Sequence, residues 1–256
     1  MPGHLEPDLE LARRFLAAHP PPGRVRCCAV TGSHLYGFPS PDSDLDLKGI
    51  HQVPTGALLG LRPDVGHHDV TAVHDGVECD LTTNELAGAL GLLLAGNGNM
   101  LERICSRYQV VTDADHEALA ALAQGAISRR FARHYTGFFA GCRREHERAP
   151  TAKSMLYSYR VALTGTHLLA TGEVEPDLRV LAPAHGYDDV AELIERKQAG
   201  EEHGGLDPGL DDHHRRRWPQ LAEALERAER ASTLPDEAVN IAEVEAWLVG
   251  LRLADV

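Results

Sequence analysis

The most informative stretch of the chain runs from Gly32 to Gly49 and reads GSHLYGFPSPDSDLDLKG. A Gly-Ser pair opens it, directly after the apolar run Val25–Val30, which predicts a buried strand followed by a turn. Two prolines then predict a loop. Asp44–Ile50 alternates polar and apolar residues, as a half-buried strand does. The stretch is therefore expected to join two strands by a short loop.

The second of these strands carries two acidic residues, Asp44 and Asp46, two positions apart. Their carboxylates should project from one face of the sheet, while Leu45 and Leu47 enter the core. Neighbouring carboxylates repel each other unless a cation lies between them. Mg²⁺ suits this position because it binds carboxylate oxygens and substrate phosphates together.

A third acidic residue, Asp80, follows in a predicted hairpin over residues 70–81, whose turn is Asp75-Gly76. Alternation along its second strand turns Asp80 away from the core. If this strand pairs antiparallel with the Asp44 strand, Asp80 reaches the same face. There it can orient an attacking hydroxyl, the task of a third carboxylate in a two-metal phosphoryl-transfer site.

Helical periodicity dominates the rest of the chain. Helices are predicted at 5–19, from Asn84 to Gly96, and near 100–105, 117–123, 128–148, 154–170, 190–197, 213–230 and 237–251. This order predicts an α+β fold, in which a small mixed β-sheet core is followed by a mostly helical C-terminal half. We expect one domain over residues 1–112 and a second, helical domain over 113–256.

Charge constrains the partners of the chain. Its 256 residues contain 25 basic and 38 acidic side chains, for a net charge of −13, so the molecule as a whole repels polyanions. A nucleic acid must therefore meet a locally basic surface. The segment Arg129–Arg160 offers eight basic side chains against two acidic ones. A pair of solvated helices whose charges are balanced by acids elsewhere is the alternative interpretation.

Cysteine use and hydropathy indicate where the chain resides. Its five cysteines are odd in number, mostly embedded in apolar stretches, and lack the spacing of a metal site. No window approaches the roughly 18 apolar residues that a membrane span needs. Both features predict a cytoplasmic protein that does not cross a membrane.

Taken together, these motifs resemble a known family. The pattern apolar-Gly-Ser, a spacer, Asp-x-Asp and a later strand Asp is similar to that of the DNA polymerase beta-like nucleotidyltransferase superfamily. More narrowly, G-S-x-x-Y-G-x5-S-D-x-D-x-x-G resembles the RNA repair-associated nucleotidyltransferases called RlaP. The likeness continues in the run 97–102 and in Lys153, Tyr157 and Arg160.

Two positions depart from the pattern of that family. Gly98 stands where the family usually has proline, which is a conservative loop change. Ser158 stands where a histidine is expected before the helix arginine, Arg160. The second departure leaves the helical part of the expected site less defined than the strand part.

The resemblance implies a reaction and a set of site residues. The reaction is attack of an acceptor hydroxyl, expected to be an RNA end, on the α-phosphate of a nucleoside triphosphate. Two Mg²⁺ ions, with Mn²⁺ as the alternative ion, would bind the catalytic residues. The implied catalytic and metal-binding residues are Asp44, Asp46 and Asp80, and the implied nucleotide-binding residues are Gly32, Ser33, Ser43, Lys153 and Tyr157.

Other functions stay open at this point. The same chemistry serves transfer to a small molecule, and a nucleotide-binding regulatory or antitoxin-like module could keep the fold without turnover. Three acids on one face argue against that module, since it has no physical need for them. Two histidine patterns are weaker: 67–69 lacks supporting metal ligands, and His213-His214 is expected to cap a solvated helix.

Overall fold

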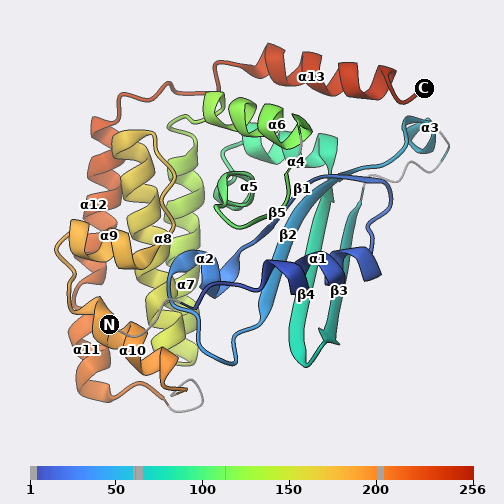
Figure 1. The fold of residues 1–256 in the computed structure, drawn as a ribbon. Coiled ribbons are helices and arrows are strands. Elements are labelled where there is room, and N and C mark those ends of the chain that lie inside the picture. Colours follow the sequence, from blue (N-terminus) through green and yellow to red (C-terminus); the bar gives the residue numbers. More distant parts are fainter. Residues whose placement is uncertain (1–4, 60, 62–65, 113, 201–204) are drawn as a thin grey trace. The chain divides into compact units, whose positions relative to one another are not determined.

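The computed structural model describes residues 5–59, 61, 66–112, 114–200 and 205–256 (Figure 1). Contacts divide the chain into two compact units, each built from separate segments. The sheet unit comprises residues 6–32, 44–127 and 237–256, and the helical unit comprises chiefly 33–43 and 128–236. Each unit is described by itself, and the predicted domain boundary near residue 112 stays a prediction.

The sheet unit is built on five strands. They are β1 (Arg24–Val30), β2 (Leu45–Gln52), β3 (His67–His74), β4 (Val77–Glu85) and β5 (Gln109–Val111), in the order β3-β4-β2-β1-β5. β1 pairs antiparallel with β2 and β5, β3 pairs antiparallel with β4, and β2 pairs parallel with β4. The predicted mixed sheet and α+β class are confirmed.

The pairing of β2 with β4 differs from the expected antiparallel one. The predicted hairpin forms, with positive φ at both Asp75 (50°) and Gly76 (84°), as a tight two-residue turn requires. It places β3 at the edge of the sheet, so that β4 returns in the same direction as β2. The parallel register nevertheless pairs Asp46 with Asp80 directly.

Helices surround this sheet in the same unit. They are α1 (Leu9–Ala18), α3 (Thr55–Leu58), α4 (Leu86–Leu94), α5 (Gly98–Cys105), α6 (Ala114–Gly125) and α13 (Ile241–Leu253). α1 crosses in front of the sheet in Figure 1, and the Phe15 ring lies 5.7 Å from that of His74 on β3. This packing buries the face that Leu45 and Leu47 present.

The opposite face of the sheet is covered at one end by α5. Arg103 donates to the carbonyl of Gly49 (3.0 Å) and to Asn84 Oδ1 (2.8 Å), and Ile50 is fully buried there. Alternation along β2 puts Asp46 on the same face as Ile50. Asp46 is only half-buried, because it lies farther from α5 along the strand. An accessible part of this face therefore remains beside a rigid core.

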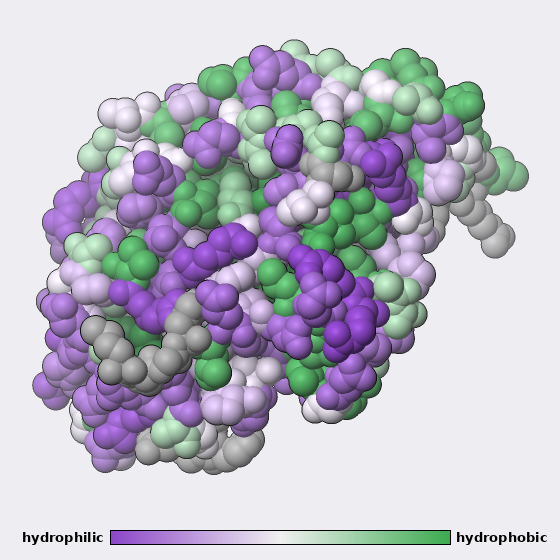
Figure 2. All heavy atoms as spheres, viewed as in Figure 1, coloured by the Kyte–Doolittle hydropathy of each residue, from purple (hydrophilic) through white to green (hydrophobic). Residues whose placement is uncertain are grey.

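The last helix, α13, is tied to the sheet unit by polar contacts. Arg252 pairs with Glu85 and donates to the carbonyl of Val53 (2.9 Å). Asn240, just before the helix, donates to the carbonyl of Leu122 (2.8 Å). α13 also carries exposed apolar residues such as Leu253. Hydrophobic side chains gather at the upper right of Figure 2, where Figure 1 draws the end of α13.

The helical unit is built around α8. Its elements are α2 (Gly32–Tyr36, of which Gly32 belongs to the sheet unit), α7 (Phe131–Arg148), α8 (Ala152–Thr171), α9 (Leu178–Ala184), α10 (Val190–Gln198), α11 (Pro208–Arg215) and α12 (Trp218–Ala231). A capping box between Thr151 and Ser154 begins α8, and Gly172 ends it with φ of 76°. α7, α9, α10 and α12 all pack against α8, which is therefore largely buried.

One predicted helix, 213–230, is two helices in the structure. α11 ends at Arg215 and α12 begins at Trp218. Pro219 explains the break, because its ring would clash with the carbonyl of Arg215 in a continuous helix. Proline is instead accepted in the first turn of α12, where no N–H bond is lost.

None of the helices in the described ranges is both long and apolar enough to span a membrane.

Candidate active site

In the sheet unit, Asp46 is held at the end of β1. The N–H of Thr31, just after β1, donates to the carbonyl of Asp46 on β2 (2.8 Å), so the two segments stay in register there. Gly32 follows with φ of +62°, and a Cβ atom at this position would overlap with Oδ2 of Asp46. Only glycine allows this approach. The Gly32 of the motif thus makes room for the Asp46 carboxylate.

Asp80 lies opposite Asp46 and interacts with a cation of the protein itself. Lys48 Nζ lies 3.0 Å from Oδ2 of Asp80 and 3.1 Å from the hydroxyl of Thr82. Both side chains of the ion pair are partly exposed, at 24% and 36%. Lys48 therefore neutralises part of the negative charge on this face.

Asp44 is exposed and directly precedes β2, so that alternation places it on the face of Asp46. Three carboxylates on one face are the hard oxygen donors that Mg²⁺ prefers, and the donor set therefore fits such an ion. Their ligand atoms do not form a group in which all lie within 4.8 Å of one another. Lys48 would have to share Asp80 or leave it for Asp80 to bind an ion.

Two predicted nucleotide-binding serines lie in the helical unit. Ser33 is 7% exposed, and its carbonyl accepts the N–H of Phe38 (3.1 Å). Ser43 hydrogen-bonds to Ser40, with 2.9 Å between the two hydroxyl oxygens, and also to Lys197 (3.3 Å). The serines therefore shape the loop that follows α2, whatever further contacts they make.

Lys153 and Tyr157 line one pocket of about 430 Å³ within the helical unit. The remaining lining residues are Phe138, Cys142, Glu145, Ala149, Thr151 and Ser154. Tyr157 also packs edge-on against Tyr36 (5.8 Å) and Phe38 (5.6 Å), so the aromatic residues of the motif loop fix its ring. Apolar and polar side chains thus line the pocket together, as they do in many small-molecule sites.

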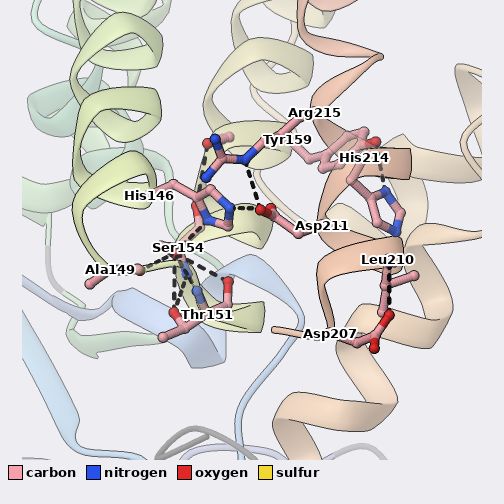
Figure 3. A network of polar contacts seen from close by, with 11 residues as sticks. His146, Ala149, Thr151, Ser154, Tyr159, Asp207, Leu210, Asp211, His214 and Arg215 are labelled. Atoms are coloured by element: carbon pink, nitrogen blue, oxygen red, sulfur yellow. Dashed lines mark hydrogen bonds and ion pairs between the residues drawn. The ribbon is translucent and has the colours of Figure 1, made fainter. Parts of the chain in front are cut away.

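Figure 3 shows a polar network that includes two of the pocket residues, Thr151 and Ser154. His146 is fully buried, with Nδ1 at 2.7 Å from the Ser154 hydroxyl and Nε2 at 2.6 Å from Asp211. Burial lowers the pKa of His146, so the ring is neutral near pH 7 and joins the two partners. The Ser154 hydroxyl also accepts the N–H of Thr151 in the capping box. We assign this Ser-His-Asp array to holding α7, α8 and α11 together.

A second cluster brings together Asp189, His213 and His214, whose ligand atoms lie within 4.8 Å of one another. It is the one such group among the residues that the structure describes. Arg217 reaches both carboxylate oxygens of Asp189, at 2.9 and 2.7 Å, and His213 lies 2.6 Å from the same carboxylate. A metal ion would have to displace this guanidinium, so the cluster fits an ion-pair network.

His214 is buried, which corrects its expected place on a solvated helix. The reason is tertiary: the hydroxyl of Tyr159 on α8 hydrogen-bonds to Nδ1 of His214 (2.9 Å). Burial lowers the pKa of His214 to about 4; the neighbouring His213 and Arg217 also lower it, whereas the Asp189 carboxylate raises it.

This burial predicts a loss of stability in acid. As the pH falls from about 6.5 towards 4, the unfolded chain takes up a proton at His214 before the folded chain does. The free energy of unfolding should therefore fall in this window, by up to about 1.4 kcal/mol per pH unit from this group. Urea titrations at several pH values should show a shallower dependence in His214→Gln.

His67→Gln on β3 provides the control for that measurement, because the ring of His67 is 68% exposed and its partner within 3.0 Å, Asp69, is exposed as well. Equal pH dependence in His214→Gln and in the unsubstituted protein would contradict the assignment.

The predicted basic segment is only partly available at the surface. Arg160 is 1% exposed, with its guanidinium carbon 3.8 Å from the centre of the Tyr36 ring. Arg129 pairs with Asp236. The exposed basic residues of the segment are Arg130, Arg133, Arg144, Arg148 and Lys153. Arg160 therefore supports the motif loop and cannot serve as a surface contact.

Sequence reasoning missed Lys197, which contacts the motif loop from α10. It is 1% exposed and donates to the hydroxyl of Ser40 (2.9 Å). The only available signal was composition, because the chain has three lysines among 25 basic residues. Neither spacing nor periodicity relates position 197 to the motif.

Two comparisons with known proteins found matches to this chain. A crystal structure of a nucleotidyltransferase-like protein from Exiguobacterium sibiricum matches with 13% identity and a TM-score of 0.34, over 95% of this chain and 79% of that one. No curated protein matches. The pattern of RlaP, described as an RNA repair pathway DNA polymerase beta family, matches residues 17–250. The match covers most of the chain, and the protein therefore belongs to the RlaP family.

Proposed function

We propose that the protein transfers a nucleoside monophosphate from a nucleoside triphosphate to an acceptor hydroxyl, and that this hydroxyl belongs to an RNA end. The observation that carries the proposal is the arrangement of Gly32, Asp46 and Asp80. A glycine that can accept no side chain fits against one carboxylate, and the other lies opposite it in parallel register. Membership of a nucleotidyltransferase-like family supports the same reaction.

In this proposal Asp44, Asp46 and Asp80 hold divalent ions, Mg²⁺ or Mn²⁺. When bound, such ions stabilise charge on the reacting phosphate and the leaving pyrophosphate. Asp80 accepts a hydrogen bond from the acceptor hydroxyl and thereby orients it. Lys48 pairs with Asp80, so an ion that binds Asp80 would share this carboxylate with Lys48 or displace the ammonium.

The nucleotide is proposed to contact residues of the Gly32–Gly49 motif and residues of α8. Gly32 and Ser33 offer backbone N–H groups to phosphate oxygens. Lys153 contributes a point charge for the triphosphate, and Tyr157 offers an aromatic surface for the base. Ser43 contributes through the loop that it shapes.

The experiment is transfer of label from each of the four nucleoside triphosphates, with Mg²⁺, to separate pools of RNA and of small hydroxyl compounds. Label retained on RNA supports the proposal. Label on a small compound alone would show that the acceptor is a small molecule and not an RNA end. Label on neither, with nucleotide still bound, would favour a non-catalytic nucleotide-binding module.

RNA binding is expected to depend on salt and on the exposed arginines of α7. Arg144 and Arg148 are exposed and one helical turn apart. If the segment neutralises about three phosphates of a single strand, log affinity falls with log salt at a slope of roughly −2. The double substitution Arg144→Ala/Arg148→Ala should weaken binding and flatten this slope.

The matched control is Arg227→Ala/Arg230→Ala on α12, where both arginines pair with glutamates and are more than half exposed. Equal losses in the two double variants would mean that net charge alone is responsible. RNA binding would then not be assigned to α7.

A further inference from the structure

Lys197 lies in the last turn of α10 and is buried against the motif loop. Its ammonium donates to the hydroxyls of Ser40 (2.9 Å) and Ser43 (3.3 Å). Ser40 is itself only 3% exposed. These contacts join residues about 155 positions apart in the sequence, within one unit.

The loop that receives this ammonium closes on itself. The N–H of Ser43 donates to the carbonyl of Ser40 (3.0 Å), and the N–H of Ser40 donates to the hydroxyl oxygen of Ser43 (2.9 Å). The two hydroxyl oxygens are 2.9 Å apart. Pro39 and Pro41 limit the backbone on either side of Ser40. The result is a small, rigid turn.

Counting donors and acceptors fixes the roles in this turn. A serine hydroxyl has one proton and two lone pairs. Ser43 uses both lone pairs, for the ammonium of Lys197 and the N–H of Ser40, so that its own proton is directed to the oxygen of Ser40. The Ser43 hydroxyl is thereby fully occupied inside the turn.

Burying the ammonium of Lys197 carries a cost in free energy. Removing it from water is unfavourable, and an apolar side chain of similar volume is often as stable or more so. At this buried position, a methionine would fill a similar volume without a buried charge. What lysine adds is its hydrogen-bond donors. What those donors hold is the turn whose last residue, Ser43, is joined by a peptide bond to Asp44.

We propose that Lys197 is a positioning residue for the Ser-Asp-x-Asp motif: its ammonium fixes the Ser40–Ser43 turn, and thereby the backbone that leads directly into Asp44. The role rests on the proposed function of Asp44. In this role Lys197 acts through the hydroxyls of Ser40 and Ser43.

The first test needs no enzymatic activity. Lys197→Met keeps the volume of the side chain but removes its donors. Hydrogen exchange at the Ser43 amide and in the peptide that covers residues 39–46 should become at least tenfold faster, while exchange in α8 stays unchanged. Arg196→Met is the control, because the Arg196 side chain is partly exposed (37%) and pairs with Glu192 on its own helix. Unchanged exchange at 39–46 would overturn the proposal.

The second test separates positioning from stability. With the variants well below their melting temperatures, Lys197→Met should lower kcat by roughly tenfold to a hundredfold, as expected for small misplacements of reacting groups. The KM for the triphosphate should stay within about twofold, because the variant keeps the contacts that bind the triphosphate equally well before and during the reaction. A kcat equal to that of Arg196→Met would overturn the proposal.

If Lys197→Met does not fold, Ser40→Ala removes one acceptor of the ammonium, and the same two measurements decide with smaller expected changes. A protein that transfers no nucleotide to any acceptor refutes the proposed function. The exchange measurement still decides whether Lys197 fixes the turn.

Discussion

Replacing Asp46 with alanine is expected to abolish nucleotide transfer and to leave the fold intact. In the proposed site this carboxylate binds the ions that stabilise the transition state, which contributes several kcal/mol. A loss of at least about a thousandfold in rate follows. Folding should persist because Asp46 is only half-buried, while its neighbours Leu45 and Leu47 fill the core.

The measurement is single-turnover transfer of label, together with thermal unfolding of the same samples. Asp44→Ala should behave similarly, and Asp212→Ala is the control because it removes an exposed carboxylate of α11. An unfolded Asp46→Ala protein would mean that its carboxylate supports the fold. Undiminished transfer in that variant would remove Asp46 from the proposed chemistry.

The second large effect is on stability. Arg252→Ala is expected to lower the free energy of unfolding by about 3 kcal/mol, because it leaves a buried carboxylate without its cation. The Glu85 side chain is 1% exposed and keeps one other contact, the N–H of Ala87 at 2.8 Å. Arg252 also donates to the carbonyl of Val53, which would lose this bond. Urea unfolding measures the change.

Two further variants make this prediction specific. Adding Glu85→Gln to Arg252→Ala removes the unpaired charge and should recover part of the loss. Arg230→Ala breaks an exposed ion pair with Glu226 and should change stability by less than about 1 kcal/mol. Equal effects of Arg252→Ala and Arg230→Ala would show that the buried pair contributes no more than an exposed one.

Local patterns predicted most of the elements that build the candidate site. Alternation in Asp44–Ile50 and the Asp75-Gly76 turn identified β2 and the β3-β4 hairpin, because strand faces and tight turns depend on a few neighbouring residues. The direction of β4 relative to β2 was wrong. It depends on which edge of the sheet β3 occupies, and no local pattern encodes that choice.

Features that depend on distant contacts were not predictable. The residues next to His214 in the sequence are charged and suggest a solvated helix. In the structure, however, His214 is buried and hydrogen-bonds to the hydroxyl of Tyr159. Short elements such as α9 and β5 lack a measurable period, and the structure alone reveals them. The roles of Asp80, Lys153 and Tyr157 in nucleotide transfer stay predictions.

The return of α13 to the sheet unit affects how the protein can be made. Ribosomes deliver a chain from its N-terminal end, and domains of contiguous sequence fold as they emerge. The sheet unit does not have that option: its Glu85 and Thr55 wait for Arg252, and its α6 waits for Asn240. The buried Glu85 at the end of β4 thus gains its ion pair with Arg252 only when residues 237–256 have left the ribosome.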